Sequence, residues 1–348
     1  MKFLVVGDSY MPVEVFRRAF ERLGDDQRFE YLQLDMAQTD VRGSDSERRI
    51  REYAGSPRQI SERLSDHDGL VVHGGAVTDA VLDAAPGLRL VCCARGGPVN
   101  IDVEAATARG IPVVTTPGKN AEAVADLTIA FLVLLARGVM RAAAFLSNGG
   151  RVGESTFEGA EWFGHDLGGH LLGLVGYGQV GRRVALRAVA MGMLVASFDP
   201  FVDPAAMAAD GVRPADFGEL LAEARFVSLH ARQPATGADL FGEPEFARMR
   251  AGSFFVNTAR ETLVDERALF AALSSGHLAG AALDVLRPRP PGQVNPLLGL
   301  PTVVATPHIG GATFETLDRG AEMVAEEIER FDSGAALVNV INPQVLVG

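Results

Sequence analysis

Cysteine is almost absent from this chain of 348 residues, which contains only Cys92 and Cys93. Because the two residues are adjacent inside an apolar run, they cannot form a disulfide framework or a cysteine-rich zinc site. The simpler interpretation makes them small core residues of a strand. A chain that does not rely on disulfides suits a reducing compartment, so we expect a cytoplasmic protein.

Positive charge is scarce as well. The chain has 32 Lys and Arg residues against 44 Asp and Glu, its net charge is −12, and only Lys2 and Lys119 are lysines. The excess of Arg over Lys is most simply a codon bias. No basic tail or cluster is present, and phosphate backbones require a positive surface, so we exclude nucleic acid as the main partner.

Long apolar stretches are missing too. No segment reaches the roughly 18 uninterrupted apolar residues that cross a bilayer, so we expect no membrane association. The chain begins Met1-Lys2-Phe3-Leu4-Val5-Val6-Gly7-Asp8, and Asp8 comes too early for a secretory signal, so a first strand is expected there. The composition, 47% hydrophobic and 22% charged, is that of a globular protein with large cores.

Short apolar runs alternate with helical patterns along the chain, which predicts parallel sheets covered by helices on both faces and therefore two α/β domains. An apolar helix is expected from Asn120 to about Phe145, either buried or at a subunit contact. A helix over about Phe314–Phe331 and a strand over Ala336–Val340 should end the chain. The other predicted strands are Phe3–Val6, Tyr31–Leu34, Leu70–Val72, Leu90–Cys93, Val113–Val114, Leu171–Val175, Leu194–Phe198, Phe226–Leu229, Phe254–Val256, Ala279–Leu283 and Thr302–Ala305.

A glycine motif of the form G-x-G-x-x-G lies between the predicted strand Leu171–Val175 and a helix beginning at Gln179. Gly176 permits a tight turn, Gly178 lets the backbone approach a diphosphate, and Gly181 permits close packing of helix and strand. Asp199 ends the next strand, where an acidic residue binds an adenosine ribose. A carboxylate there repels a 2′-phosphate, which favours NAD over NADP.

Three further polar residues follow predicted strands, where open α/β sheets place their sites: Arg260, Asp284 and His308. Taken singly, each has an ordinary explanation as a loop charge, a turn cap or a loop histidine. Together with a dinucleotide-binding motif they form a coherent set. No histidine spacing or acidic cluster indicates a metal site.

These motifs resemble those of the D-isomer-specific 2-hydroxyacid dehydrogenases, the family that includes phosphoglycerate dehydrogenase and hydroxypyruvate reductase. The similarity covers nearly the whole chain and is densest from Gly169 to Thr313. The stretches that carry it are Leu171–Gly181, Asp199-Pro200, Val227–His230, Asn257–Arg260, Ala282–Val285, Pro307–Thr313, Asn100–Asp102, Ala105–Thr107 and Asn120–Asp126.

The resemblance implies two doubly wound parallel-sheet domains, with a Rossmann cofactor domain inserted into a flavodoxin-like substrate domain. Residues 117–311 would bind NAD, and residues 1–116 with 312–348 would bind a small substrate that carries an acidic group. It also implies a homodimer formed through the cofactor domains, which suits the apolar helix Asn120–Phe145.

The resemblance further implies hydride transfer between nicotinamide and C2 of a small D-2-hydroxy acid or its 2-oxo partner, with phosphorylated and sugar-derived acids included among the candidates. His308 would be the acid and base, and Arg260 would bind the substrate carboxylate. The cofactor would be held by Gly176, Gly178, Gln179, Val180, Gly181, Asp199, Thr258 and Asp284, and the substrate's acidic end by the Gly74-Gly75 and Gly96-Gly97 loops.

One position departs from the family pattern. Arg289 stands where the family has a glutamate that orients the histidine and raises its pKa, and Glu261 replaces a usual glycine. Three interpretations are open: Glu261 supports His308, Arg289 binds an anionic substrate, or Arg289 points to solvent and His308 works unaided. If the position matters, Arg289→Glu should raise the pH limit of any reductase activity.

The loops expected to bind substrate differ as well. His73 lies near the place where some family members have a substrate-binding arginine, so it is either a substrate ligand or a loop histidine. Arg95 and Pro98 replace small residues, which indicates an uncommon substrate. His230 either touches NAD or is structural. The alternative function is a catalytically weak NAD(H)-sensing protein with the same fold, which the missing glutamate favours.

Overall fold

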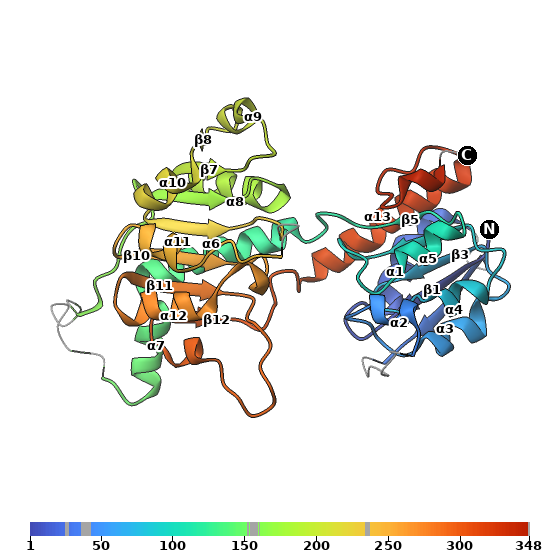
Figure 1. Ribbon diagram of the computed structural model, residues 1–348, viewed down its shortest axis with the longest axis horizontal. Helices are drawn as coiled ribbons and strands as arrows, with labels where there is room; N and C mark the ends of the chain where they lie inside the picture. The colour runs from blue at the N-terminus through green and yellow to red at the C-terminus, as the bar shows by residue number, and fades with distance from the viewer. Residues whose placement is uncertain are drawn as a thin grey trace. The chain divides into compact units, whose positions relative to one another are not determined.

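The computed structural model describes residues 1–24, 28–35, 43–151, 153, 159, 161–233 and 237–346. The chain forms two compact units (Figure 1). Unit 1 comprises Met1–Lys119 and Thr313–Gly348, and unit 2 comprises Asn120–Ala312. The units therefore divide between Lys119 and Asn120 and between Ala312 and Thr313.

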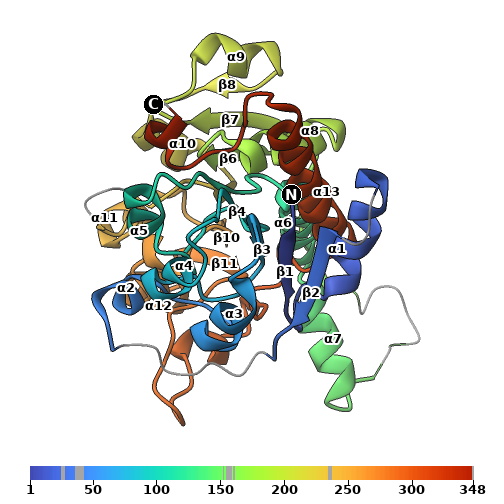
Figure 2. The same ribbon diagram turned by 90° about the vertical axis from the view of Figure 1, so that its right-hand side faces the viewer.

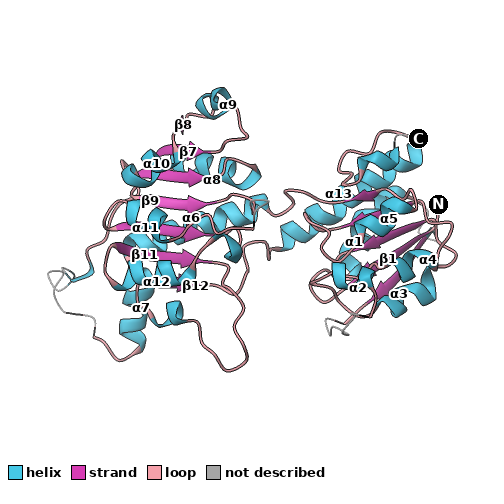
Figure 3. Ribbon diagram, viewed as in Figure 1, coloured by secondary structure: helices cyan, strands magenta, loops and turns pink. Residues whose placement is uncertain are grey.

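Unit 1 contains a parallel sheet of five strands in the order β2-β1-β3-β4-β5. The strands are β1 (Phe3–Gly7), β2 (Phe29–Gln33), β3 (Gly69–Val72), β4 (Leu90–Cys93) and β5 (Val113–Val114). The order reverses between β1 and β3, as in flavodoxin-like folds. This confirms the predicted class of the unit (Figure 3).

Alternate residues of these strands pack on opposite faces of the sheet. Phe3 and Val5 face α1 (Val13–Phe20) and α13 (Phe314–Ser333), which lie side by side (Figure 2). Leu4 and Val6 face α3 (Pro57–Leu64) on the other side, where α4 (Asp79–Asp83) and α5 (Val103–Ala108) also pack. The short helix η1 (Glu21–Leu23) continues α1.

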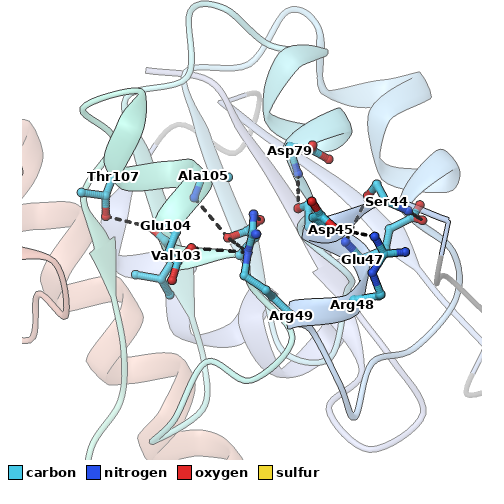
Figure 4. Close-up of polar contacts among 12 residues, drawn as sticks. Ser44, Asp45, Glu47, Arg48, Arg49, Asp79, Val103, Glu104, Ala105 and Thr107 are labelled. Atoms are coloured by element: carbon cyan, nitrogen blue, oxygen red, sulfur yellow. Dashed lines mark hydrogen bonds and ion pairs between the residues drawn. The ribbon is translucent and has the colours of Figure 1, made fainter.

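A short helix, α2 (Asp45–Arg49), is attached to this second face by polar contacts (Figure 4). Its first residue follows a capping box between Ser44 and Glu47. At its end, Arg49 Nη2 lies 2.6 Å from Oδ2 of Asp102, which also caps α5. Burial would raise the pKa of Asp102, but the hydrogen bonds from Arg49 and Ser46 outweigh it and lower that pKa.

The predicted strand Ala336–Val340 is wrong. Only Val340 pairs with the sheet, through a single antiparallel bridge to Val114. The backbone N–H groups of Val338 and Asn339 instead donate to the fully buried carboxylate of Glu327 on α13, both at 3.1 Å. A side chain thus takes the hydrogen bonds that a strand would make, and η6 (Pro343–Leu346) follows.

Unit 2 contains a parallel sheet of seven strands in the order β12-β11-β10-β9-β6-β7-β8. This order is that of a Rossmann fold extended by one strand, which confirms the predicted class. The strands are β6 (Leu171–Val175), β7 (Leu194–Phe198), β8 (Arg213–Pro214), β9 (Phe226–Leu229), β10 (Ser253–Asn257), β11 (Leu278–Leu283) and β12 (Val303–Ala305).

Helices cover both faces of this sheet. One face packs on α6 (Ala121–Arg137) and α8 (Gln179–Ala190). The other packs on α10 (Phe217–Glu223), α11 (Glu243–Arg248) and α12 (Glu266–Ser274). Four short elements were not predicted from the sequence: β8, α9 (Pro204–Ala209), α10 and α11. They have only two to seven residues and so show little periodicity. The 3-10 helices are η4 (Glu261–Leu263) and η5 (Pro296–Gly299).

The single helix predicted from Asn120 to Phe145 is in fact two. Gly138 has φ +59° and ends α6, and α7 (Val139–Ser147) continues at an angle of 67°. No single helix among the described residues is long and apolar enough to cross a membrane; α6 and α7 pass that test only as this bent pair. α6 is largely buried, whereas α7 has no buried residue.

Candidate active site

The glycine motif forms a tight turn between β6 and α8. Gly176 has φ +101°, and a Cβ at this position would lie 2.7 Å from the backbone nitrogen of Ala231. At Gly181 a Cβ would lie 2.2 Å from the carbonyl oxygen of Gly176. Both positions therefore require glycine, one for the turn and one for the close approach of the helix.

Gly178 is different, because no atom lies within 4 Å of where its Cβ would be. It is exposed, and α8 begins at the next residue, Gln179. The N–H groups of Gln179 and Val180 belong to the first helical turn, which lacks partners within the helix. The turn therefore offers open space, free donors and the positive end of a helix dipole, which fit a diphosphate.

Asp199 connects the glycine turn to the end of β7. Its Oδ2 accepts a hydrogen bond from the Tyr177 nitrogen at 2.8 Å and its Oδ1 accepts one from Phe201 at 2.9 Å. Each carboxylate oxygen retains acceptor capacity beyond these bonds, so the half-buried side chain fits a ribose hydroxyl.

His230 lies behind the turn. A Cβ at Gly176 would meet its carbonyl carbon at 2.7 Å, and its ring Nε2 is 2.9 Å from Ser228 Oγ. Burial lowers the pKa of His230 to about 3, so the ring is neutral at pH 7. These contacts give His230 a structural role at the turn.

The loop after β10 carries Arg260 and is shaped by Asn257, a residue to which the sequence analysis gave no role. Asn257 Oδ1 accepts from the Ala259 nitrogen at 2.9 Å, and its Nδ2 donates to the Arg260 carbonyl at 3.0 Å. The Arg260 side chain is exposed. Thr258 is buried, and its Oγ1 lies 3.0 Å from Oγ1 of Thr128 on α6.

The loop after β12 carries His308 and is held by Asp284, which follows β11. The Asp284 carboxylate is buried and accepts hydrogen bonds from the backbone nitrogens of Ile309 and Gly310, both at 2.8 Å, and from the Thr306 hydroxyl at 2.6 Å. His308 itself has φ +58°, an uncommon conformation for a residue other than glycine, and its ring is exposed.

The two loops are also joined through their strands. β10, β11 and β12 are neighbours in the sheet, and the Asp284 nitrogen donates to the Asn257 carbonyl at 3.0 Å. Arg260 and His308 therefore stand at the same carboxyl edge, on loops anchored by Asn257 and Asp284. The polar strand ends singled out from the sequence are grouped as expected from a parallel sheet.

Arg289 does not point freely to solvent. Its Nη2 lies 2.7 Å from Oε2 of Glu266, a buried carboxylate on α12, and its side chain is 37% exposed. Glu266 also accepts from the Arg287 nitrogen at 2.7 Å and from Asn295 Nδ2 at 2.9 Å. Within the described parts of the chain, neither Glu261 nor any other residue hydrogen-bonds the His308 ring.

In unit 1, His73 is paired with Asp8 where the strand order reverses. His73 Nδ1 is 2.8 Å from Asp8 Oδ2, and Tyr10 stacks on the imidazole at 5.2 Å between ring centroids. Burial lowers the pKa of His73, although the contact with Asp8 opposes this shift. Burial would raise the pKa of Asp8, but the contacts with His73 and with backbone N–H groups outweigh it and lower that pKa. A neutral ring that donates to Asp8 through Nδ1 leaves Nε2 as an acceptor.

The glycine loops of unit 1 are ordered by side chains around them. Gly74 N donates to Asp8 Oδ2 at 2.9 Å, and Asn100 Nδ2 donates to the Gly75 carbonyl at 2.7 Å. A Cβ at Gly97 would meet no atom within 4 Å, and at Gly96 the nearest atom would be 3.7 Å away. The Gly96-Gly97 loop therefore has open space for a ligand group.

Comparison with known proteins places these features in a family. Residues 129–310 match the model of the D-isomer specific 2-hydroxyacid dehydrogenase, NAD binding domain. A solved structure of the TT0316 protein from Thermus thermophilus covers 98% of this chain and 100% of its own, with 34% identity and a TM-score of 0.76.

Two curated relatives are similar over most of this chain. Glyoxylate reductase of Korarchaeum cryptofilum is 38% identical over 292 residues, 84% of this chain and 87% of that protein. D-3-phosphoglycerate dehydrogenase of Methanocaldococcus jannaschii is 37% identical over 286 residues, 82% of this chain. The match spans only 53% of that second protein.

Proposed function

Because the chain belongs to the D-isomer specific 2-hydroxyacid dehydrogenase family, we propose that it is an NAD-dependent oxidoreductase. It would transfer a hydride between the nicotinamide and C2 of a small D-2-hydroxy acid or 2-oxo acid. The observation that carries this proposal is the carboxyl edge of the seven-stranded sheet. That edge bears an open glycine turn and, on two anchored loops, a guanidinium and an imidazole.

The cofactor would be held by the residues around the glycine turn. Gly176, Gly178 and Gly181 with the N–H groups of Gln179 and Val180 would bind the diphosphate, and the Asp199 carboxylate would bind the adenosine ribose. Thr258 and Asp284 would line the nicotinamide end. The Asp199 charge disfavours a 2′-phosphate, which supports NAD over NADP.

Bound NAD supplies the hydride acceptor, and its reduced form supplies the hydride. Arg260 would bind the substrate carboxylate through its planar guanidinium and polarise the 2-oxo group. His308 would give a proton to the substrate oxygen during reduction and remove it during oxidation. Since its loop is fixed by Asp284, the imidazole would be oriented from the backbone rather than by a carboxylate on its ring.

The acidic end of the substrate would be held in unit 1 by Gly74, Gly75, Gly96 and Gly97, whose loops are ordered while the second pair borders open space. His73 Nε2, as an acceptor, would suit a substrate hydroxyl. Relatives are named for phosphoglycerate and glyoxylate, so we propose a substrate of that size.

A spectrophotometric assay of NADH oxidation tests the function. Glyoxylate, hydroxypyruvate, pyruvate and phosphorylated 2-oxo acids would be compared, each with NADH and with NADPH. We expect turnover of at least one acid with NADH, a loss of about 100-fold or more in kcat for His308→Gln, and a raised KM for Arg260→Lys. NADH binding without turnover of any acid would instead support a sensor, an alternative that depends on the missing glutamate at position 289 and that the relatives named above do not support.

We also propose that the protein is a cytoplasmic homodimer that associates through α7. The four large apolar side chains of this helix are 40–49% exposed: Val139, Met140, Phe145 and Leu146. An apolar surface of this kind commonly marks a protein interface. The free, buried Cys92 and Cys93 are compatible with a reducing compartment.

A further inference from the structure

Lys119, the last residue of unit 1 before α6, is a buried cation. Its side chain is 8% exposed, and its ammonium has no hydrogen-bond partner within the described residues. An ammonium removed from water without a partner is unfavourable, so a lysine in this position needs an explanation. Its backbone is fixed, because Arg319 Nε on α13 donates to the Lys119 carbonyl at 2.8 Å.

The position of Lys119 is that of a ligand-binding residue in an open parallel sheet. The turn from Thr116 to Lys119 follows β5, and the Thr116 nitrogen donates to the Arg95 carbonyl at 2.9 Å on the loop after β4. Asp8 and His73 follow β1 and β3. All five residues lie at the carboxyl edge of the sheet, where such folds bind ligands.

The neighbouring charged groups are already engaged with other partners. Asp8 Oδ1 accepts from the Tyr10 and Met11 nitrogens, both at 2.9 Å, and its Oδ2 contacts His73 and Gly74. Arg95 Nη2 is 2.5 Å from Glu52 Oε2. Lys119 therefore forms no ion pair with these groups within the described parts of the chain.

A second donor on the same turn is also unsatisfied. The Thr116 hydroxyl is buried and makes no hydrogen bond to the described part of the chain. The adjoining Gly96-Gly97 loop borders open space, and its two N–H groups donate no hydrogen bond to described residues. The two loops adjoin, since a Cβ at Gly96 would lie 3.7 Å from the Thr116 carbonyl oxygen. An ammonium, a hydroxyl and backbone donors on two adjoining loops are complementary to an anionic oxygen group.

We propose that Lys119 and Thr116 form a subsite for a second anionic group of the substrate. The chain would then prefer 2-hydroxy acids that carry a phosphate or a second carboxylate over acids that have a single carboxylate. The four-carbon stem of Lys119 brings the ammonium to the entering group by rotation about its side-chain bonds. The identity of the ligand as substrate rests on the proposed function, whereas the subsite itself follows from unit 1.

Selective labelling tests the subsite without turnover, since Lys2 is the only other lysine. Protein labelled with [ε-13C]lysine should give two lysine signals, and burial lowers the pKa of Lys119 to about 8, which identifies its signal in a pH titration. Inorganic phosphate, D-malate and D-3-phosphoglycerate should shift the Lys119 signal and raise that pKa at millimolar concentration. D-lactate should do so much less. The exposed Lys2 is the internal control.

Two variants complete the test. Lys119→Met should weaken binding of D-malate and D-3-phosphoglycerate by about 10- to 100-fold while leaving D-lactate binding unchanged. Gly320→Ala acts indirectly: its new methyl group would lie 2.9 Å from Lys119 Cδ and should displace the ammonium and weaken binding.

The proposal fails if no anion moves the Lys119 signal, or if D-lactate moves it as strongly as D-malate. Because the titration needs neither NADH nor catalysis, its result is independent of the assay of the proposed function. A protein that binds these anions through Lys119 but reduces no acid would refute the proposed function and leave the anion site standing.

Discussion

The contact between Arg289 and Glu266 decides what the unusual residue at position 289 does. Glu266, on helix α12, is buried and pairs with the partly exposed guanidinium of Arg289, so the two charges largely cancel where the loop that carries Arg289 meets this helix. Arg289 therefore acts on that loop rather than as a free cation beside His308.

Arg289→Gln removes the charge and should lower the free energy of unfolding by about 1–2 kcal/mol, because Glu266 keeps two other donors but loses its cation. The pH limit of NADH oxidation should stay the same. Chemical denaturation and the pH–rate profile measure the two effects. Arg213→Gln, which breaks an exposed ion pair with Glu223, is the control and should cost less than about 0.5 kcal/mol.

A shifted pH–rate limit for Arg289→Gln would show that residue 289 does influence His308. The charge-reversing substitution Arg289→Glu is a less clear test of whether residue 289 influences His308 than the sequence indicated. It would place a second carboxylate against Glu266 and strain the loop by charge repulsion.

Residue types near strand ends were predictable from the sequence, but their partners were not. Arg260, Asp284 and His308 follow strands whose apolar runs identify them, so a parallel sheet brings them to one edge. The pairing of Arg289 with Glu266 joins a loop residue to a helix residue 23 positions earlier, and the loop itself has no periodicity that would predict a partner. The role of Lys119 was not predictable either, because the spacing of residues in a sequence does not show that a lysine is buried without a partner.

At the level of elements, Asp284 makes the loop after β12 a defined structure. Its carboxylate accepts three hydrogen bonds from that loop, and His308 N donates to the Asp284 carbonyl at 2.8 Å. An amide in place of the carboxylate would have only one acceptor oxygen for these donors. The positive φ of His308 is maintained by this arrangement.

Asp284→Asn should therefore loosen the loop more than it destabilises the fold. We expect faster hydrogen exchange at the Ile309 and Gly310 amides by at least about 10-fold, together with a lower kcat and a melting temperature within a few degrees of the parent. Asp203→Asn, which alters the cap of α9 in the same unit, is the matched control and should leave these amides unchanged. Unchanged exchange in Asp284→Asn would contradict the role given to the carboxylate.

Two elements differ from what the apolar pattern of the sequence predicts. The apolar pattern of Asn120–Phe145 continues through Gly138, so the sequence predicts one helix, although a glycine with positive φ bends the chain there. The strand expected at Ala336–Val340 does not form, because two of its N–H groups donate to the buried carboxylate of Glu327 instead. In both cases a single residue outweighed a favourable pattern.

At the scale of the whole molecule, the exposed apolar side chains of α7 are either covered by a partner or lower the solubility of the protein. The net charge of −12 opposes association, so a contact between copies must come from apolar area rather than from charge attraction. Met140 and Leu146 are each 49% exposed, and the only tryptophan, Trp162, packs on Phe145 with ring centroids 5.2 Å apart. Trp162 lies outside α7 but packs on it, so its fluorescence reports on the surroundings of this helix.

The double substitution Met140→Glu and Leu146→Glu should convert the proposed dimer to a monomer, since a carboxylate in an apolar interface is left without a partner. Light scattering coupled to size-exclusion chromatography would give half the mass of the parent, and Trp162 fluorescence would no longer change on dilution. Leu346→Glu, at a site equally exposed but in unit 1, is the matched control and should remain dimeric. If the double variant keeps the parent mass, association does not occur through α7, and another apolar surface must hold the copies together.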